Sequence, residues 1–229
     1  AMANDTFEYR WKPGTSPDTL LKVPFGYTKT IADGMVIERD VAVTMRDGIK
    51  IYVDLFRPEH AKGPLPTLIA WSPYGKSAPK GGYERFENNG GVKPEWISKY
   101  AGFETPDPLY WARHGYAYIA ADSRGMWNSE GNATFWSSDE ALDFYDLIEW
   151  TAAQSWSNGK VGAAGVSYFA IVQWHNLMIC LLKNFMNIQK KTKKHQKCFC
   201  LAILGELLLQ KVLHNANCIE KFYPRQDKM

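Results

Sequence analysis

Apolar and polar residues alternate in two neighbouring stretches of the chain, residues 35–45 and 49–58, with Asp47 and Gly48 between them. Alternation with a period of two residues is typical of a strand with one buried face, and an Asp-Gly pair favours a tight turn. The two stretches therefore predict a β-hairpin. Residues 1–33 are polar and interrupted by prolines, and we expect a loop-rich N-terminal segment there.

Two further runs predict strands that are buried on both faces, and a third run predicts a strand of small residues. Residues 66–73 and 116–125 are apolar, and residues 156–167 are rich in small side chains. Helical patterns separate these runs: residues 107–115 end at a glycine suited to stop a helix, and residues 137–154 open with a Ser-x-x-Glu capping box. This order predicts an α/β fold, in which a mixed and mostly parallel sheet is flanked by helices. Chemistry in such folds collects at the carboxyl ends of the strands.

The composition indicates a globular domain followed by a different kind of tail. Of the 229 residues, 45% are apolar and 14% aromatic, which suits one folded core. Residues 1–174 carry 17 Lys or Arg and 21 Asp or Glu, whereas residues 175–229 carry 10 and 3. All nine tryptophans lie in the first part and all four cysteines in the second. We therefore expect the main domain over residues 34–174 and an unrelated, basic, helical tail over residues 175–229.

Two stretches of the tail have candidate binding roles. The basic run at residues 190–197 could bind nucleic acid or an acidic membrane surface, but no aromatic residues are interleaved with it. We expect a solvated linker there and no nucleic acid partner. Residues 201–213 are apolar and helical in pattern, yet shorter than the roughly 20 residues that span a bilayer. We expect no membrane span, and instead packing on the sheet or self-association with another chain.

Cysteine usage and the start of the sequence favour a reducing, cytoplasmic compartment. No charged segment followed by an apolar one opens the sequence, as a secretion signal would. Cys198 and Cys200 lack a second ligand pair at zinc-finger spacing. We expect free thiols and no metal site.

The segment GVSYFA, residues 165–170, has the form of a nucleophile elbow. A small residue two positions before Ser167 permits the tight strand-to-helix turn that exposes a serine hydroxyl. From about Val41 to Trp174 the sequence resembles the cocaine esterase / X-prolyl dipeptidyl peptidase family of α/β hydrolases, often called CocE/NonD hydrolases. Six motifs in order carry the resemblance: VTMRDGIKIYVDLFRP, PYGK, HGYAYIAADSRG, SEG, DFYDLIEWTAAQSWSNGKVG, and GVSYFA followed by QW.

The resemblance implies the N-terminal part of an α/β-hydrolase fold, and a serine hydrolase that acts on ester or amide bonds, Xaa-Pro peptides included. It makes Ser167 the nucleophile, and it makes the Tyr168 backbone N–H and the Tyr74 hydroxyl the oxyanion hole. The substrate would be a small-molecule ester or a peptide. Serine hydrolysis needs no metal or organic cofactor, so we expect none.

Two positions depart from the family pattern, which usually has glycine where this chain has Trp127 and Ala170. We expect Ala170 to be tolerated on its helix, and Trp127 to crowd or cover the turn beside it. In the motif DSRG we expect Arg124 to pair with a carboxylate in a structural turn, rather than to take part in catalysis.

The residues after QW match nothing in the family pattern, so the family's triad Asp and His are not identifiable. A general base must lie about 3 Å from the serine hydroxyl. His175 lies two helical turns beyond Ser167, and nothing evident places His195 or His214. The sequence thus predicts a serine hydrolase truncated before its triad Asp and His, poorly active or inactive as this chain. A catalytically inactive fragment and a binding or regulatory module are the alternatives.

Overall fold

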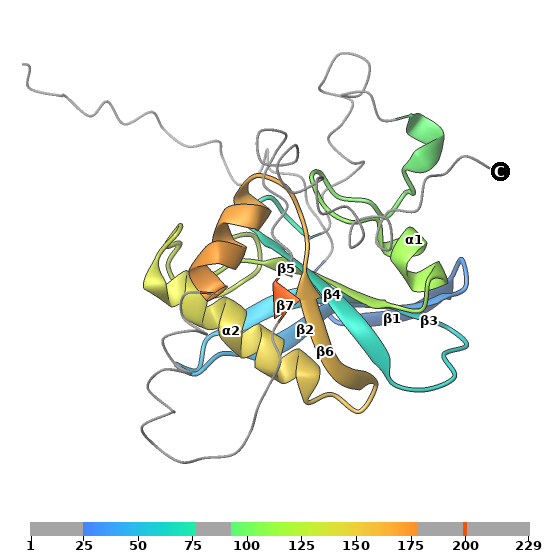
Figure 1. Ribbon diagram of the computed structural model, residues 1–229. Helices are drawn as coiled ribbons and strands as arrows, with labels where there is room; N and C mark the ends of the chain where they lie inside the picture. Colours follow the sequence, from blue (N-terminus) through green and yellow to red (C-terminus); the bar gives the residue numbers. More distant parts are fainter. Residues whose placement is uncertain (1–24, 77–92, 178–198, 201–229) are drawn as a thin grey trace, which may run out of the picture.

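The computed structural model describes residues 25–76, 93–177 and 199–200, which form one seven-stranded mixed sheet with helices (Figure 1). The strand order is β1-β2-β3-β5-β4-β6-β7. The pairs from β1 to β5 along this order are antiparallel, and β5, β4, β6 and β7 are parallel. The strands are β1 (Thr28–Ala32), β2 (Met35–Thr44), β3 (Lys50–Pro58), β4 (Leu65–Ser72), β5 (Ala117–Asp122), β6 (Ser157–Ala163) and β7 (Phe199–Cys200).

The helical elements lie on both faces of the sheet. Figure 1 shows α2 beside the helix that follows β6, and Asn176 Nδ2 of that helix donates to the Ala141 carbonyl of α2 at 3.1 Å. The elements are the 3-10 turn η4 (Pro94–Trp96), α1 (Pro108–Arg113), α2 (Ser138–Ala152) and the helix over residues 168–177.

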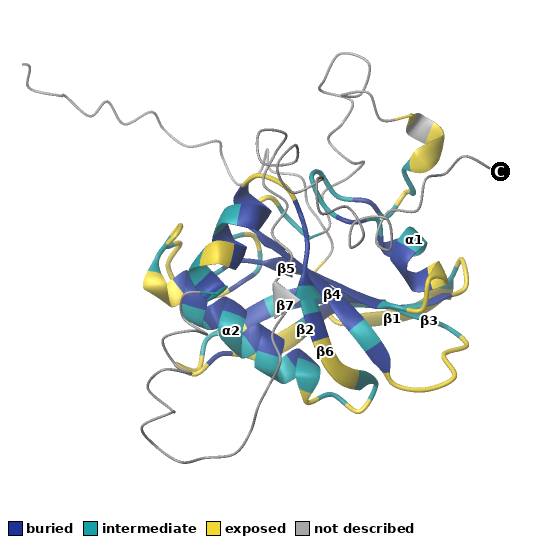
Figure 2. Ribbon diagram, viewed as in Figure 1, coloured by how far each residue is buried: buried dark blue, intermediate teal, exposed yellow. Residues whose placement is uncertain are grey.

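The core consists of two apolar clusters, one on each face of the sheet, and β5 contributes to both. Ile119 packs in the cluster that includes α2, and its neighbour Tyr118 packs in the cluster that includes α1. Successive strand residues point to opposite faces, so α1 and α2 cover opposite sides. All six residues of β5 are buried (Figure 2). This burial on both faces confirms that the apolar runs are central strands.

The predicted hairpin is confirmed, and the edge strand β1, like β7 in the tail predicted to be helical, was not expected. β2 pairs with β3 antiparallel, with Val41 opposite Val53 and Val43 opposite Ile51. β1 lies within the segment expected to be loop-rich and pairs with β2 at the edge of the sheet. Four of its five residues are exposed, so its sequence carries no pattern of buried positions.

Helix α2 begins as predicted, but the sequence spacing predicts its buried face only in part. The Ser137 side chain caps the helix by accepting a 3.1 Å hydrogen bond from the Glu140 N–H. The helical spacing of Leu142, Tyr145, Ile148 and Ala152 favours a face of which the structure buries Ile148 and leaves the other three half-buried. Phe144, which stacks on a core tryptophan, is fully buried. Packing of Phe144 on the distant Trp71 therefore decides which residues of the helix are buried.

The described part of the tail adds a helix end and a strand. His175 and Asn176 continue the helix that begins at residue 168, and β7 pairs in parallel with β6. The basic run at 190–197 and the predicted helix at 201–213 lie outside the described residues and stay predictions. Within the described ranges, every helix is too short or too polar to cross a membrane.

Candidate active site

Three neighbouring parallel strands, β5, β4 and β6, end at the same edge of the sheet. Asp122 is the last residue of β5, Tyr74 follows β4, and Ser167 follows β6. The structure therefore brings these residues to one edge, as the order of strands and helices predicts.

Ser167 lies on a tight turn between β6 and the helix over residues 168–177. Its φ is 56°, in the left-handed region that costs a non-glycine residue roughly 1–2 kcal/mol. The residue is exposed, and its carbonyl accepts hydrogen bonds of 3.0 Å from the N–H groups of Ala170 and Ile171. The predicted strand-turn-helix arrangement is thus present, with the serine in the strained position that an elbow requires.

Gly165 makes the turn sterically possible. Its φ is 148°, and a Cβ placed on it would lie 2.4 Å from the Cβ of Phe169. Only glycine permits so close an approach of the strand end to the helix. On the other side of the turn, the Val166 N–H donates to the Glu104 carbonyl at 3.2 Å.

Tyr74 lies beside the serine turn, against the first residues of the helix that follows Ser167. Its ring packs edge-on against Tyr168 and Phe169, with ring centroids 5.9 and 5.8 Å apart. Burial and then the charge of Glu104 raise the pKa of Tyr74 above its ordinary value of 10.0, and the Ser167 side chain opposes the rise. Tyr74 is therefore a neutral phenol near pH 7, able to donate a hydrogen bond.

Tyr168 is the first residue of the helix after the turn. The first N–H groups of a helix have no partner within it and point outward with the positive end of the helix dipole. Within the described residues, the Tyr168 N–H donates to no acceptor. Tyr74, Ser167 and Tyr168 are thus neighbours at one edge of the sheet.

Trp127 covers the turn that carries Tyr74, as its bulk predicts. The indole N–H donates to the Pro73 carbonyl at 3.0 Å. The ring also lies over Gly75, where an added Cβ would lie 2.7 Å from the nearest ring atom. Gly75 has a φ of 101°, so both its conformation and its lack of a side chain are needed there.

A buried ionic cluster lies next to the same turn. The Lys76 backbone N–H donates to Asp122 at 2.6 Å, and Lys76 Nζ lies 3.2 Å from Asp122 and 2.7 Å from Asp40. Burial raises the pKa of Asp122 to about 6, although Lys76 works against the rise. Burial also works to lower the pKa of Lys76, but Asp122, Asp54 and Asp40 outweigh it and raise that pKa. The cluster ties the end of β5 to the segment after Tyr74.

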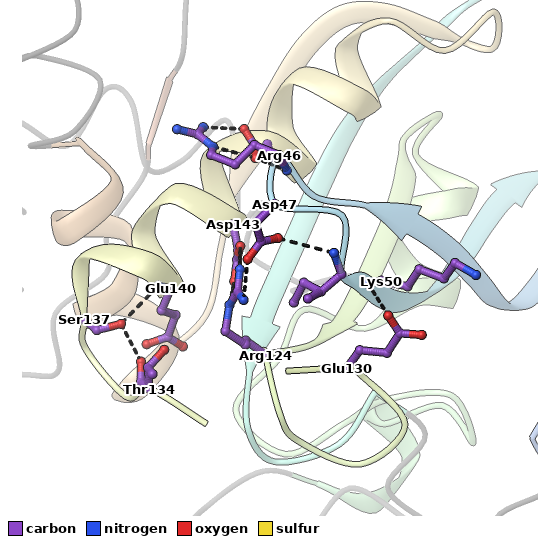
Figure 3. Close-up of polar contacts among 11 residues, drawn as sticks. Arg46, Asp47, Lys50, Arg124, Glu130, Thr134, Ser137, Glu140 and Asp143 are labelled. Carbon is purple, nitrogen blue, oxygen red and sulfur yellow. Dashed lines mark hydrogen bonds and ion pairs between the residues drawn. The ribbon is translucent and has the colours of Figure 1, made fainter. Parts of the chain in front are cut away.

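Arg124 pairs with carboxylates, as expected, and has a structural role (Figure 3). Its Nε and one terminal nitrogen each donate to Asp143 at 2.6 Å, and the other terminal nitrogen donates to Asp47 at 2.7 Å. Only 13% of the Arg124 side chain and 1% of the Asp143 side chain are exposed. The Arg124–Asp143 pair links the turn after β5 to α2, and the Arg124–Asp47 pair links it to the β2–β3 turn.

No sequence pattern indicates that the carboxylates of Glu104 and Glu140 lie near the site. Glu104 has a φ of 59°, and burial raises the pKa of its carboxyl, one oxygen of which is buried without a hydrogen-bond partner in the described part of the chain. Glu140 is recognisable only as a capping-box residue, yet it accepts a 2.6 Å hydrogen bond from the Tyr168 hydroxyl. Local patterns cannot indicate such contacts, because they join residues far apart in the chain.

None of the three histidines in the described ranges contacts Ser167. His60 is exposed, and His114 Nδ1 lies 2.7 Å from the Tyr110 carbonyl at the end of α1. His175 lies eight residues along the helix, about 12 Å by the rise per residue. In the same ranges no three His, Cys, Asp or Glu side chains are grouped to hold a metal ion.

Known proteins share this arrangement over a part of their length. The family model of X-Pro dipeptidyl-peptidase (S15 family) matches residues 47–178. Cocaine esterase of Rhodococcus sp. (strain MB1 Bresler) is 36% identical over 138 residues, which are 60% of this chain and 20% of that protein. A crystal structure of a CocE/NonD family hydrolase from Staphylococcus aureus superposes with a TM-score of 0.59 at 35% identity, over 69% of this chain and 29% of the other.

These comparisons fix the fold and the family. The superposed structure is a hydrolase, and the described part of this chain has the α/β-hydrolase arrangement that the sequence predicts. The chain spans about a fifth of the length of the curated relative it matches. Because the family model covers more than half of its residues, the chain belongs to the X-Pro dipeptidyl-peptidase (S15) family.

Proposed function

We propose that this chain carries the nucleophile and the oxyanion hole of a serine hydrolase that acts on ester or amide bonds. The main supporting observation is the conformation of Ser167, which is exposed at a φ of 56° between a parallel strand and a helix, with the Tyr74 ring packed against the next residue, Tyr168. Membership of the S15 family and the similarity to cocaine esterase favour the same chemistry.

In this proposal the Ser167 hydroxyl oxygen attacks the carbonyl carbon of the substrate, and its proton passes to a base. The Tyr168 backbone N–H and the Tyr74 hydroxyl donate hydrogen bonds to the oxyanion that forms. One such donor stabilises the transition state by roughly 3 kcal/mol. The tetrahedral intermediate then expels the alcohol or amine, and water hydrolyses the acyl-serine.

Small-molecule esters and peptides are the proposed substrates. The family is described as X-Pro dipeptidyl-peptidase, which cleaves an amide bond, and the Rhodococcus relative is a cocaine esterase. Ester and amide hydrolysis pass through the same tetrahedral oxyanion. The site chemistry therefore suits both bonds, and the choice between them depends on the pocket around the substrate.

We also propose that this chain alone hydrolyses substrates slowly. A serine hydroxyl is a weak nucleophile at neutral pH without an adjacent base, and none of the described histidines adjoins Ser167. Without its triad partners, a serine hydrolase site retains about 10³ to 10⁴-fold acceleration over water. Low turnover is therefore expected from this chain.

The test is hydrolysis of p-nitrophenyl acetate and of an Xaa-Pro p-nitroanilide by the wild type, Ser167→Ala and Tyr74→Phe. Slow turnover that Ser167→Ala abolishes, and that Tyr74→Phe lowers by about 10²-fold, supports the proposal. Equal rates in the wild type and Ser167→Ala contradict it. Rapid turnover lost in Ser167→Ala keeps the nucleophile but shows that a base does reach the serine.

A further inference from the structure

The Glu140 carboxylate is buried and joins three separate segments around the candidate site. Only 2% of Glu140 is exposed. Its Oε1 accepts hydrogen bonds from the Tyr168 hydroxyl at 2.6 Å and from Trp71 Nε1 at 3.0 Å, and its Oε2 accepts one from the Trp136 backbone N–H at 2.7 Å. These donors belong to the helix after the serine turn, to the end of β4 and to the loop before α2.

Burial of the Glu140 carboxylate has a free-energy cost that stabilising the start of helix α2 alone would not require. Removing a charge from water costs several kcal/mol unless hydrogen bonds or an opposite charge offset it. Among the described residues Glu140 has no cationic partner, so the three hydrogen bonds and the N-terminus of α2 provide the compensation. The cap itself is formed by Ser137 (Figure 3). Its Oγ accepts a hydrogen bond from the Glu140 backbone N–H and donates one to the Thr134 carbonyl.

The Tyr168 ring, whose hydroxyl Glu140 binds, packs against Tyr74, one of the two candidate oxyanion donors. Trp136 stacks on the Tyr168 ring at a centroid distance of 5.6 Å and an angle of 28°, and Tyr74 meets the same ring edge-on at 5.9 Å. Burial, and next the hydrogen bond to Glu140, raise the pKa of Tyr168, so the phenol stays protonated and keeps donating to the carboxylate. With its hydroxyl fixed, the Tyr168 ring supports Tyr74 and orients its own backbone.

We propose that Glu140 is a positioning residue: by holding the Tyr168 hydroxyl it fixes the Tyr168 backbone N–H and the Tyr74 phenol around Ser167. This inference rests on the proposed function, because the positions of these donors matter to catalysis only if Ser167 is the nucleophile. Glu140 acts through Tyr168 and does not contact the substrate. The competing possibility is that Glu140 merely stabilises the start of α2.

The first measurement is the rate at which a fluorophosphonate labels Ser167 in the full chain. Glu140→Gln keeps a carbonyl acceptor but places amide N–H groups opposite the Trp136 backbone N–H. Tyr168→Phe removes the hydroxyl that donates to Glu140 and keeps the ring. Each substitution is expected to slow labelling about tenfold, less than the loss of an entire donor. The double variant is expected to be no slower than the slower single variant, because both act through one contact.

The matched control is Ser137→Ala, which removes the cap of α2 but leaves the Tyr168 hydroxyl bond in place. It is expected to lower the free energy of unfolding by about 1 kcal/mol without slowing the labelling. If Glu140→Gln labels like the wild type, if the two effects multiply, or if Ser137→Ala slows labelling equally, Glu140 has only a structural role and the inference is wrong.

A second measurement separates failure of this inference from failure of the proposed function. With ¹⁵N-tyrosine in the chain, the Tyr168 amide resonance is identified by its loss in Tyr168→Phe. Glu140→Gln is expected to shift this resonance and to speed its hydrogen exchange, whereas Ser137→Ala leaves both unchanged. An unmoved Tyr168 amide in Glu140→Gln overturns the inference, whether or not Ser167 reacts. Absence of labelling in the wild type, with the amide moved, overturns the proposed function and leaves Glu140 a positioning residue for the Tyr168 backbone alone.

Discussion

The indole N–H of Trp127 donates a 3.0 Å hydrogen bond to the carbonyl of Pro73. The same ring lies over Gly75, so Trp127 holds both residues that flank Tyr74 in the chain. Trp127 itself has a φ of 52°, an unusual conformation for so large a residue. The bulky residue that departs from the family pattern therefore braces the turn next to the candidate serine instead of blocking it.

Trp127→Phe is expected to weaken this brace. The substitution removes the hydrogen bond and keeps an aromatic ring, so the free energy of unfolding should fall by about 0.5–1.5 kcal/mol, and labelling of Ser167 should slow. Urea unfolding and fluorophosphonate labelling measure the two effects. Trp96→Phe is the control, since Trp96 and Trp127 are 53% and 50% exposed and Trp96 lies on η4. Equal effects in the two variants would remove the special role of Trp127.

Asp143→Asn is expected to cost about 3 kcal/mol of unfolding free energy, because it leaves the largely buried Arg124 guanidinium without its full charge partner. Asp146, three residues further along α2, forms a more exposed pair with Arg46. Asp146→Asn should therefore cost at most about 1 kcal/mol. Urea unfolding of both variants provides the comparison. Similar losses would show that burial does not set the strength of these pairs.

The buried Asp122 carboxyl predicts a specific dependence of stability on pH. Burial raises its pKa from 3.8 to about 6, so between these values the folded chain binds more protons at this group than the unfolded chain does. The contribution of Asp122 to stability is thus largest below about pH 4 and falls, by about 3 kcal/mol, as the pH rises through 6. Lys76, Asp40 and Asp54 are the charged groups around it.

Unfolding free energies of the wild type and Asp122→Asn between pH 4 and pH 7 test this prediction. The unfolding free energy of the wild type minus that of Asp122→Asn should decrease as the pH rises. Other carboxyls act in the opposite sense, as Asp47 does, whose pKa is lowered by its hydrogen bond from Arg124. Subtracting the variant removes their contribution. A difference that is constant, or that grows with pH, would contradict the raised pKa of Asp122.

Gly165→Ala is expected to be severely destabilising. The new Cβ would lie 2.4 Å from Phe169 Cβ, and the φ of 148° suits glycine alone, so the cost should be about 3 kcal/mol or more. Gly159→Ala is a matched control, because Gly159 has a φ of 77° but open space around it. Its expected cost is about 1–2 kcal/mol. Thermal or urea unfolding distinguishes the two, and an equal cost would mean that the turn tolerates a side chain.

Much of the fold could be predicted because it is encoded in local patterns. The two-residue period around Asp47 and Gly48 defines the β2–β3 hairpin, and the Ser137 capping box defines the start of α2. β1 escaped prediction because an exposed edge strand has no buried face to produce alternation. The buried face of α2 was predicted only in part because Phe144 stacks on Trp71, a contact between distant residues.

The residues of the candidate site likewise include some that the sequence indicates and others that it does not. Ser167, Tyr74 and Tyr168 lie in short motifs at strand ends, and the structure brings them together. The residues that support them do not lie in such motifs. Glu140 meets Tyr168 across 28 positions and Lys76 meets Asp122 across 46, so only the folded arrangement reveals these contacts.

The most direct test of Ser167 as the nucleophile is fluorophosphonate labelling of the full wild-type chain, with the modified residue located by mass spectrometry. The expected result is one adduct on Ser167, formed slowly relative to a known serine hydrolase assayed in parallel, and absent from Ser167→Ala. Tyr74→Phe should slow it further, since a hydrogen bond to the phosphoryl oxygen is lost. An adduct on another residue, or labelling that is unchanged in Ser167→Ala, would contradict the assignment of Ser167 as the nucleophile.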